Sequence, residues 1–175
     1  NRHHISRVTI TMAESFDIAG RGGFYDGVGA IRDVVQNHLL QMIALLAMEP
    51  PIDEAADSLR VEKVKVLRAM RAGDPTRSVR GQYLGYLDEA GVAPNSQTET
   101  FVAMELFIDS WRWSGVPFAI RAGKAMAETI TEAVVEFRPP PTAMFGGADK
   151  IAGSSILRFR MKPDNAITLT MQAKT

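Results

Sequence analysis

The spacing of the apolar residues changes once along this chain, and that change constrains the fold more than any other feature. Between residues 30 and 49 the apolar residues recur at helical intervals, and beyond residue 98 they alternate with polar ones. Alternation with a period of two predicts half-buried strands, whereas recurrence every three to four residues predicts helices. We therefore expect helices early in the chain and a run of strands in its second half.

Segments with the strand period follow one another after residue 98, without an insert long enough for a helix between them. Consecutive strands of this kind favour antiparallel pairing. With helices gathered earlier in the chain, the pattern predicts an α+β fold in which helices pack on one face of a large, mainly antiparallel sheet. The predicted strands cover residues 7–16, 81–86, 99–108, 117–126, 129–138, 154–162 and 166–174.

The predicted central helix covers residues 30–49 and ends at two consecutive prolines. From Leu39 onward it is apolar nearly all round, which predicts burial on most of its sides. A second helix follows, and either Asp53 or Asp57 can cap its first turn.

Length, charge and cysteine content limit the number of domains, the partners and the cell compartment that this chain can have. A chain of 175 residues, 46% of them apolar, can bury one sizeable core, so we expect residues 1–175 to form a single domain. Its 20 basic and 20 acidic residues balance, which argues against nucleic acid or a membrane surface as a partner. No apolar run reaches the roughly 18 residues of a membrane span. The lack of cysteine excludes thiolate metal sites and fits a reducing compartment, so we expect a cytoplasmic protein without a bound metal.

Five glycines within residues 20–29, GRGGFYDGVG, could form a loop that binds a phosphate or a turn that leads into the helix behind it. Neither G-x-G-x-x-G nor G-x-x-x-x-G-K-[ST] fits these residues. The sequence therefore favours a turn in which glycines let backbone segments pass close together at the start of the helix.

His38 is the residue of the central helix that most suggests chemistry. It lies seven residues after Ile31 and four before Met42, so α-helical spacing places it on the apolar stripe. Burial there would keep the imidazole neutral, which is the state that a general base needs. The alternative is a core histidine hydrogen-bonded to a backbone carbonyl, and the residues alone favour this alternative.

Two charged residues stand where predicted elements begin or end. Asp33 lies near the start of the helix, where it could bind a substrate hydroxyl or, as is commoner, favour the helix dipole as a first-turn acid. Lys124 ends a strand at a glycine turn, from which its cation could reach into a pocket or, as is commoner, stay solvated. The residues alone leave both alternatives open.

Longer segments, taken together and in order, resemble the C-terminal, substrate-binding domain of the glucose-6-phosphate dehydrogenase family. They are GRGGFYDGVGAIRDVVQNHLLQMIALLAMEPP, VEKVKVLRAM, GQY and ETFVAMELFIDSWRWSGVPFAIRAGKAM. The resemblance covers residues 1 to about 175, and IRDVVQNHLLQM and RW-x-GVPF-x-x-R-x-GK are its most specific parts. It implies an enzyme of the oxidative pentose phosphate pathway that oxidises glucose 6-phosphate at C1 to 6-phosphogluconolactone and passes hydride to NADP.

The resemblance also implies roles for five residues. His38, in QNHLLQ, would be the catalytic base that takes the proton of the C1 hydroxyl as hydride leaves C1. Asp33 and Glu14 would hold sugar hydroxyls, because a carboxylate accepts hydrogen bonds from two of them. Lys124, in RAGK, would face the substrate from the sheet, and Lys162 would be a further polar contact.

Some features of the family are missing from these residues. Thr129 and Ile130 stand where many members carry basic residues, which puts one substrate-side cation in question. The N-terminal coenzyme-binding domain and the C-terminal tail are absent from the sequence, so we expect NADP to be bound mainly elsewhere, no cofactor-binding residue here, and an inactive isolated fragment.

In the family the sheet also builds a homodimer, and a run of exposed strands agrees with that use. Two alternatives to an enzyme remain open at this point. One is a non-catalytic dimerisation module, and the other is a module that binds a sugar phosphate without turning it over.

Overall fold

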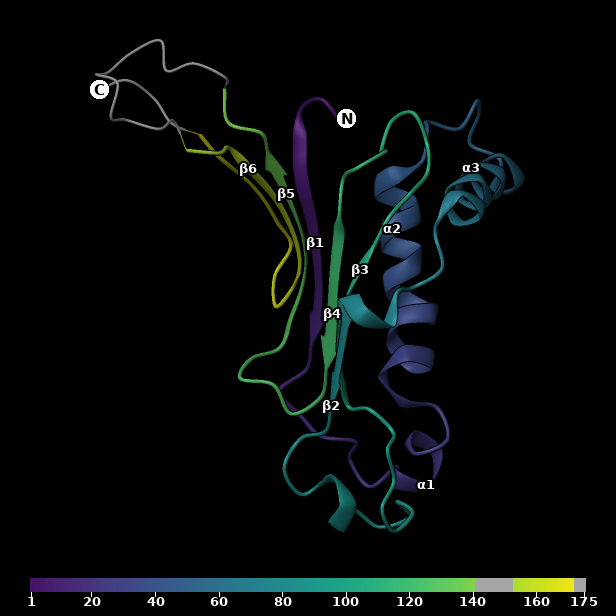
Figure 1. Ribbon diagram of the computed structural model, residues 1–175, viewed down its shortest axis with the longest axis vertical. Helices are drawn as coiled ribbons and strands as arrows, with labels where there is room; N and C mark the ends of the chain where they lie inside the picture. Colours follow the sequence, from purple (N-terminus) through teal and green to yellow (C-terminus); the bar gives the residue numbers. More distant parts are fainter. Residues whose placement is uncertain (141–152, 172–175) are drawn as a thin grey trace.

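The computed structural model describes residues 1–140 and 153–171. It contains a seven-stranded sheet in the order β2-β3-β4-β1-β5-β6-β7, and the helices lie together on one face of it (Figure 1). The strands are β1 (Ile5–Ala13), β2 (Ser78–Gly81), β3 (Phe101–Leu106), β4 (Phe118–Gly123), β5 (Ile130–Phe137), β6 (Ile156–Lys162) and β7 (Ala166–Thr170). The helical elements are α1 (Gly22–Tyr25), the π-helix η1 (Ile31–Leu39), α2 (Leu40–Ala47), α3 (Ala56–Ala69) and the 3-10 turns η2 (Pro75–Arg77) and η3 (Tyr86–Asp88).

The predicted α+β fold with a mainly antiparallel sheet is confirmed, and one pairing differs from expectation. β1 lies between β4 and β5, parallel to β4 and antiparallel to β5, so these two consecutive strands are not neighbours. Val8 and Ile10 of β1 are fully buried. A strand at the centre of the sheet hydrogen-bonds along both edges, which suits the strand with the most deeply buried side chains.

The predicted central helix is present as two consecutive helices of different geometry. Residues 31–39 form the π-helix η1, in which each N–H bonds to the carbonyl five residues earlier, and α2 continues from it with α-helical geometry. The buried residues are Val34, Val35 and Leu39 in η1 and Ile43, Ala44 and Ala47 in α2. The prediction of burial on most sides from Leu39 onward is confirmed, because only Gln41 and Leu45 are exposed between Leu39 and Met48.

Two local predictions need correction. Neither proposed aspartate is the N-cap of α3: the cap position is Ala55, and Asp53 accepts the backbone N–H of Ala55 at 3.0 Å from outside the helix. The short strand predicted at residues 81–86 lies earlier in the chain, at Ser78–Gly81, where β2 pairs with β3. The tyrosines of residues 81–86 pack in a cluster with Ile18. The last part of the predicted strand 166–174 lies outside the described residues.

The core lies between the helices and the sheet. Val35, Leu39 and Ile43 pack against the buried face of β1, β3 and β4. Trp113 closes one end of this core, and its indole N–H donates to the carbonyl of Ala47 at 2.8 Å, where α2 ends. Within the described residues no helix combines the length and apolar character that crossing a bilayer requires.

Candidate functional site

Glu14 and Lys124 meet because the two strands before them are parallel neighbours. β1 and β4 run side by side in register up to Ala13 and Gly123, so the residue after each strand leaves the sheet at the same end. The backbone N–H of Glu14 donates to the carbonyl of Gly123 at 3.0 Å. The Lys124 ammonium then forms an ion pair and a hydrogen bond with the Glu14 carboxylate.

Lys124 is buried, with 6% of its side chain exposed. Its Nζ lies 5.5 Å from the ring centroid of Phe16 and 5.9 Å from that of Tyr25. A cation close to aromatic faces is stabilised by the ring quadrupoles, and more so when water is excluded. The alternative of a solvated surface lysine is therefore wrong for Lys124.

Tyr25 connects the sheet end with the start of the central helix. Its hydroxyl is buried, and burial together with the nearby negative charges of Asp33, Glu99 and Glu14 raises its pKa well above the usual range. Carboxylates from the helix and from the sheet therefore surround one tyrosine. Asp33 and Glu14 therefore both lie close enough to Tyr25 for their charges to act on its hydroxyl.

His38 is exposed, which corrects the prediction that it lies in the apolar stripe. That prediction assumed α-helical spacing through residues 31–39, where the structure has a π-helix. Its imidazole Nε2 lies 3.5 Å from the amide nitrogen of Asn37. The alternative of a buried core histidine is wrong for the same reason, and the ring is open to a ligand.

The π-helix changes which residues share a face. In an α-helix, residues five apart point about 140° away from each other. In a π-helix the bond between residues five apart brings them to the same side of the helix. Asp33 and His38 are five apart on η1, so they project from one side of the helix, with Asp33 half-buried and His38 exposed.

Lys162 lies at the same end of the sheet but apart from the other four residues. Thr131 pairs with Met12 on one side and with Lys162 on the other, so Lys162 is two strands from β1. Its side chain is exposed. The structure therefore does not bring Lys162 into the cluster around Tyr25.

The two positions where the family often carries basic residues have packing roles here. The hydroxyl of Thr129 accepts the backbone N–H of Ser15 at 3.0 Å, directly beside Glu14. Ile130 pairs with Ala13 at the end of β1. Both residues thus hold the start of β5 against the segment that carries Glu14.

The glycine loop packs against another loop, as the turn interpretation predicted. A methyl group at Gly22 would collide with the carbonyl oxygen of Ala90, and one at Gly91 would lie 2.7 Å from the backbone nitrogen of Gly23. The glycines thus let two backbone segments touch at the start of the central helix.

Sequence reasoning missed two acidic residues near this loop. Asp26 accepts hydrogen bonds from Tyr86, Ser96 and the backbone of Ala93, and these bonds hold its pKa below the usual range. Glu99 is buried and bonds to the first residues of η1. Asp26 lies in the glycine loop and Glu99 at the first position of a predicted strand, and their partners Ala93 and Ile31 lie about 70 positions away in the chain.

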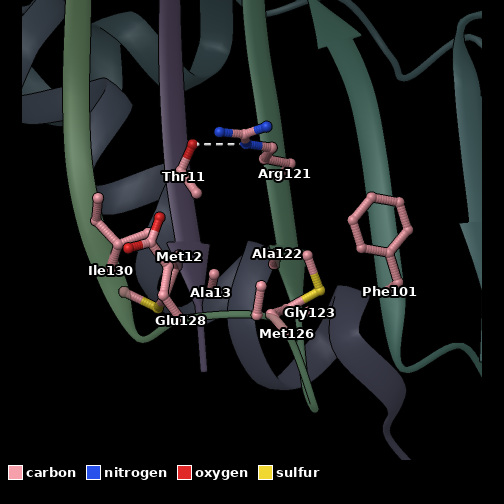
Figure 2. Close-up of a pocket in the computed structure, with 11 residues that line it drawn as sticks. Thr11, Met12, Ala13, Phe101, Arg121, Ala122, Gly123, Met126, Glu128 and Ile130 are labelled. Carbon is pink, nitrogen blue, oxygen red and sulfur yellow. Dashed lines mark hydrogen bonds between the residues drawn. The ribbon is translucent and has the colours of Figure 1, made fainter. Parts of the chain in front are cut away.

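A separate cavity lies on the sheet face opposite the helices. Figure 2 shows Arg121 beside Thr11, with its Nε donating to the threonine hydroxyl at 2.8 Å, and Phe101 and Met126 nearby. The cavity has a volume of about 160 Å³ and is lined by none of the five predicted site residues. We take the arrangement around Glu14, Lys124 and Asp33 as the candidate site because it gathers charged side chains, whereas this cavity is lined mainly by apolar ones.

The model of the glucose-6-phosphate dehydrogenase C-terminal domain matches residues 1–175. The chain belongs to this family. The membership inferred from the sequence is thereby confirmed. Glucose-6-phosphate 1-dehydrogenase 1 from Mycobacterium tuberculosis is 49% identical to this family member over 175 residues, which cover all of this chain and 38% of that protein. The Bacillus subtilis glucose-6-phosphate 1-dehydrogenase is 46% identical over 185 residues, which cover 98% of this chain and 38% of that protein.

Solved structures of the family agree with the fold. The crystal structure of the Mycobacterium avium glucose-6-phosphate 1-dehydrogenase superposes with a TM-score of 0.94 at 47% identity, covering all of this chain and 39% of that one. A glucose-6-phosphate dehydrogenase in complex with its substrate glucose-6-phosphate superposes with a TM-score of 0.91 at 40% identity. This match covers all of this chain and 37% of the solved one. This chain therefore spans a little over a third of the length of its relatives.

Proposed function

We propose that this chain is the substrate-binding part of a glucose-6-phosphate 1-dehydrogenase, which oxidises glucose 6-phosphate to 6-phosphogluconolactone and transfers hydride to NADP. The observation that carries the proposal is the ion pair between Glu14 and the buried Lys124. Asp33, on the helix that also bears His38, acts with Glu14 on the same tyrosine, and the chain is a member of this family. A relative that is 40% identical carries glucose-6-phosphate as its substrate, which supports the choice of sugar phosphate.

The paired groups keep free capacity for a sugar phosphate. An ammonium has three donors, and the ion pair with Glu14 uses one of them, so Lys124 can donate further hydrogen bonds. Glu14 and Asp33 can each accept hydrogen bonds from sugar hydroxyls and so fix the orientation of the ring. Lys162, at the same end of the sheet, would contact a more distant part of the ligand.

His38 would act as the catalytic base. Its exposed imidazole takes the proton of the C1 hydroxyl while the hydride on C1 passes to NADP, which leaves the C1 carbonyl of the lactone. Parts of the enzyme outside this sequence would then exclude water from the imidazole ring and bind most of the NADP. We propose accordingly that residues 1–175 are one domain of a longer cytoplasmic enzyme.

We also propose that the sheet builds a homodimer. The face of β1, β3 and β4 opposite the helices carries the short side chains of Thr9, Ala103 and Ala119 around a shallow cavity of about 340 Å³. The salt bridge between Arg7 and Glu105, at 2.6 Å, lies at its rim. Ala119→Glu would put a charge in this face, and sedimentation should then show monomers; an unchanged dimer would argue against this interface.

A chimera tests the enzymatic role. This chain replaces the matching 175 residues of the Mycobacterium tuberculosis relative, so that the rest of a dehydrogenase is present. We expect the chimera to reduce NADP when glucose 6-phosphate is added. Calorimetric titration with glucose 6-phosphate runs in parallel. A folded chimera that binds the sugar phosphate without reducing NADP would support a binding module, and one that dimerises without binding it would support a dimerisation module.

A further inference from the structure

The π-helical geometry of η1 places Asp33 and His38 on the same side of the helix. The contacts that stabilise this geometry therefore affect how the two side chains are aligned. π-helices are rare, occur mostly as single turns within α-helices, and are frequent at functional sites. η1 has nine residues, and neither its N-cap nor its own side chains form a capping hydrogen bond. The hydrogen bonds that set its start must therefore come from another part of the chain.

Glu99, in the segment before β3, supplies those hydrogen bonds. Its carboxylate oxygen Oε1 accepts the backbone N–H of Ile31 at 2.9 Å. Its backbone carbonyl accepts the N–H of Ala30 at 2.9 Å. One residue from the sheet side thus satisfies two consecutive N–H groups that a helix start leaves unpaired. Glu99 is 8% exposed, and its negative charge also complements the positive end of the helix dipole.

Gly29 makes room for this carboxylate. It has φ +64°, a conformation that favours glycine, and a methyl group there would lie 2.7 Å from Oε1 of Glu99 and 3.0 Å from its Cδ. A side chain at position 29 would therefore displace the group that holds the helix start. Gly29 and Glu99 form one interlocking contact.

The same short segment holds the sheet side of the site. The carbonyl of Thr100 accepts the backbone N–H of Lys124 at 3.0 Å, and Thr100 is fully buried. The hydroxyl of Tyr25 donates to the carbonyl of Glu99 at 3.4 Å. Residues 99 and 100 thus join the backbone of the helix that bears Asp33 and His38 to the backbone that bears Lys124.

We propose that Glu99, with Gly29 making space for it, is a positioning residue for the reaction, because its contact with Ile31 sets the start and the π geometry of η1 and so aligns Asp33 with His38. The proposal rests on the function proposed above. Without the acceptor, η1 can begin later or relax towards α-helical spacing, and this would turn Asp33 and His38 about 140° apart. Among the described residues the hydrogen bonds of Glu99 go to Ala30, Ile31 and Tyr25, and none goes to His38.

The chimera tests this proposal with three variants. Glu99→Ala removes the acceptor and should lower kcat/KM at least tenfold. Glu99→Gln keeps an acceptor oxygen at the same place, and it should recover most of the loss even though the charge is gone. Asp53→Ala is the matched control, because it removes a carboxylate that accepts a backbone N–H next to α3, away from the site, and it should leave kcat/KM unchanged.

Hydrogen exchange separates positioning from a general loss of stability. Glu99→Ala should raise amide exchange in the peptide that spans residues 29–36 and leave exchange in β1 and β4 unchanged. Gly29→Ala should give the same kinetic loss, and the double variant should lose no more than either single variant, because both changes break one contact.

The outcomes are distinct for the two proposals. If the unmodified chimera is active and Glu99→Ala stays within threefold of its kcat/KM, or if Glu99→Gln is as impaired as Glu99→Ala, the positioning role is refuted and the proposed function stands. If the unmodified chimera folds but does not reduce NADP, the proposed function is refuted. In that case unchanged exchange at residues 29–36 in Glu99→Ala would refute the positioning role as well.

Discussion

The two sides of the candidate site differ in how completely this chain builds them. On the sheet side, Lys124 is buried, paired with Glu14 and packed against two aromatic rings. On the helix side, Asp33 is half-buried and His38 is exposed, with a neighbouring asparagine amide at 3.5 Å. The proposed binding groups Lys124 and Glu14 are thus held in place by contacts within these residues, whereas the imidazole of the proposed base is exposed.

This difference corresponds to two proposed tasks, which are holding the ligand on the sheet side and removing a proton on the helix side. A group that holds a ligand gains from rigid placement before the ligand arrives. A base that works on a bound sugar beside a nicotinamide must be reachable from the coenzyme side, and closing of the site can exclude water afterwards. Substitutions of Lys124 on the sheet side should therefore affect both stability and binding, and substitution of His38 on the helix side should affect turnover alone.

The largest effect should follow from His38→Asn in the chimera. We expect kcat to fall by roughly 10²–10⁴-fold, which is the usual contribution of a general base. Because His38 is exposed, the free energy of unfolding should change by less than about 0.5 kcal/mol. Stopped assays of NADP reduction and a urea titration measure the two quantities. A rate within threefold of the unmodified chimera would exclude His38 as the base.

Lys124→Met, on the sheet side, should lower stability and binding, whereas His38→Asn should lower turnover alone. It leaves the Glu14 carboxylate without its cation, and we expect a loss of about 3 kcal/mol in the free energy of unfolding, together with weaker binding of glucose 6-phosphate. The double variant Glu14→Gln/Lys124→Met should recover part of the stability but none of the binding. Urea titration and calorimetry test both. Unchanged stability in Lys124→Met would mean that the sheet side is no more preorganised than the helix side.

A smaller effect is expected in the loop that joins the two sides. Gly22→Ala places a methyl group against the carbonyl of Ala90 and should cost about 1–3 kcal/mol of stability. Gly23→Ala is the control, because its nearest contact would be the carbonyl oxygen of Gly91 at 3.8 Å, and it should be close to neutral. Equal stability of the two variants would contradict the close packing of this loop.

The smallest effect concerns pH and Asp26, which ties the same loop to residues 86–96. Hydrogen bonds from Ser96 and from the backbone of Ala93 lower the pKa of Asp26 in the folded state. A carboxyl group with a lowered folded pKa contributes stability above its unfolded pKa of about 3.9, and this contribution is lost as the pH falls through the folded value. Asp26→Asn should therefore flatten the fall in stability below about pH 4. An identical acid titration of both proteins would rule out this contribution.

The sequence was sufficient for the fold class and for most strands, because alternation of apolar and polar residues is a local signal. The place of β1 between β4 and β5 could not be predicted, since strand order depends on contacts between residues more than 100 positions apart. The burial of Lys124 has the same cause, because its partner Glu14 lies 110 positions away.

The helix side shows a different limit. The residues of η1 were assigned to a helix correctly, but His38 was placed on the wrong face because the spacing was assumed to be α-helical. Nothing within residues 31–39 indicates a π-helix. Its start is held by Glu99, which is 68 positions from Ile31. The geometry of the helix thus depends on a distant residue that sequence patterns did not single out.

The most direct test is a crystal structure of the chimera with glucose 6-phosphate bound. We predict that the sugar lies at the end of β1 and β4, in contact with Lys124, Glu14 and Asp33. The C1 hydroxyl should lie about 2.6–3.2 Å from an imidazole nitrogen of His38, within hydrogen-bond reach. A sugar phosphate bound elsewhere, or one bound there with His38 still directed into solvent, would contradict the account.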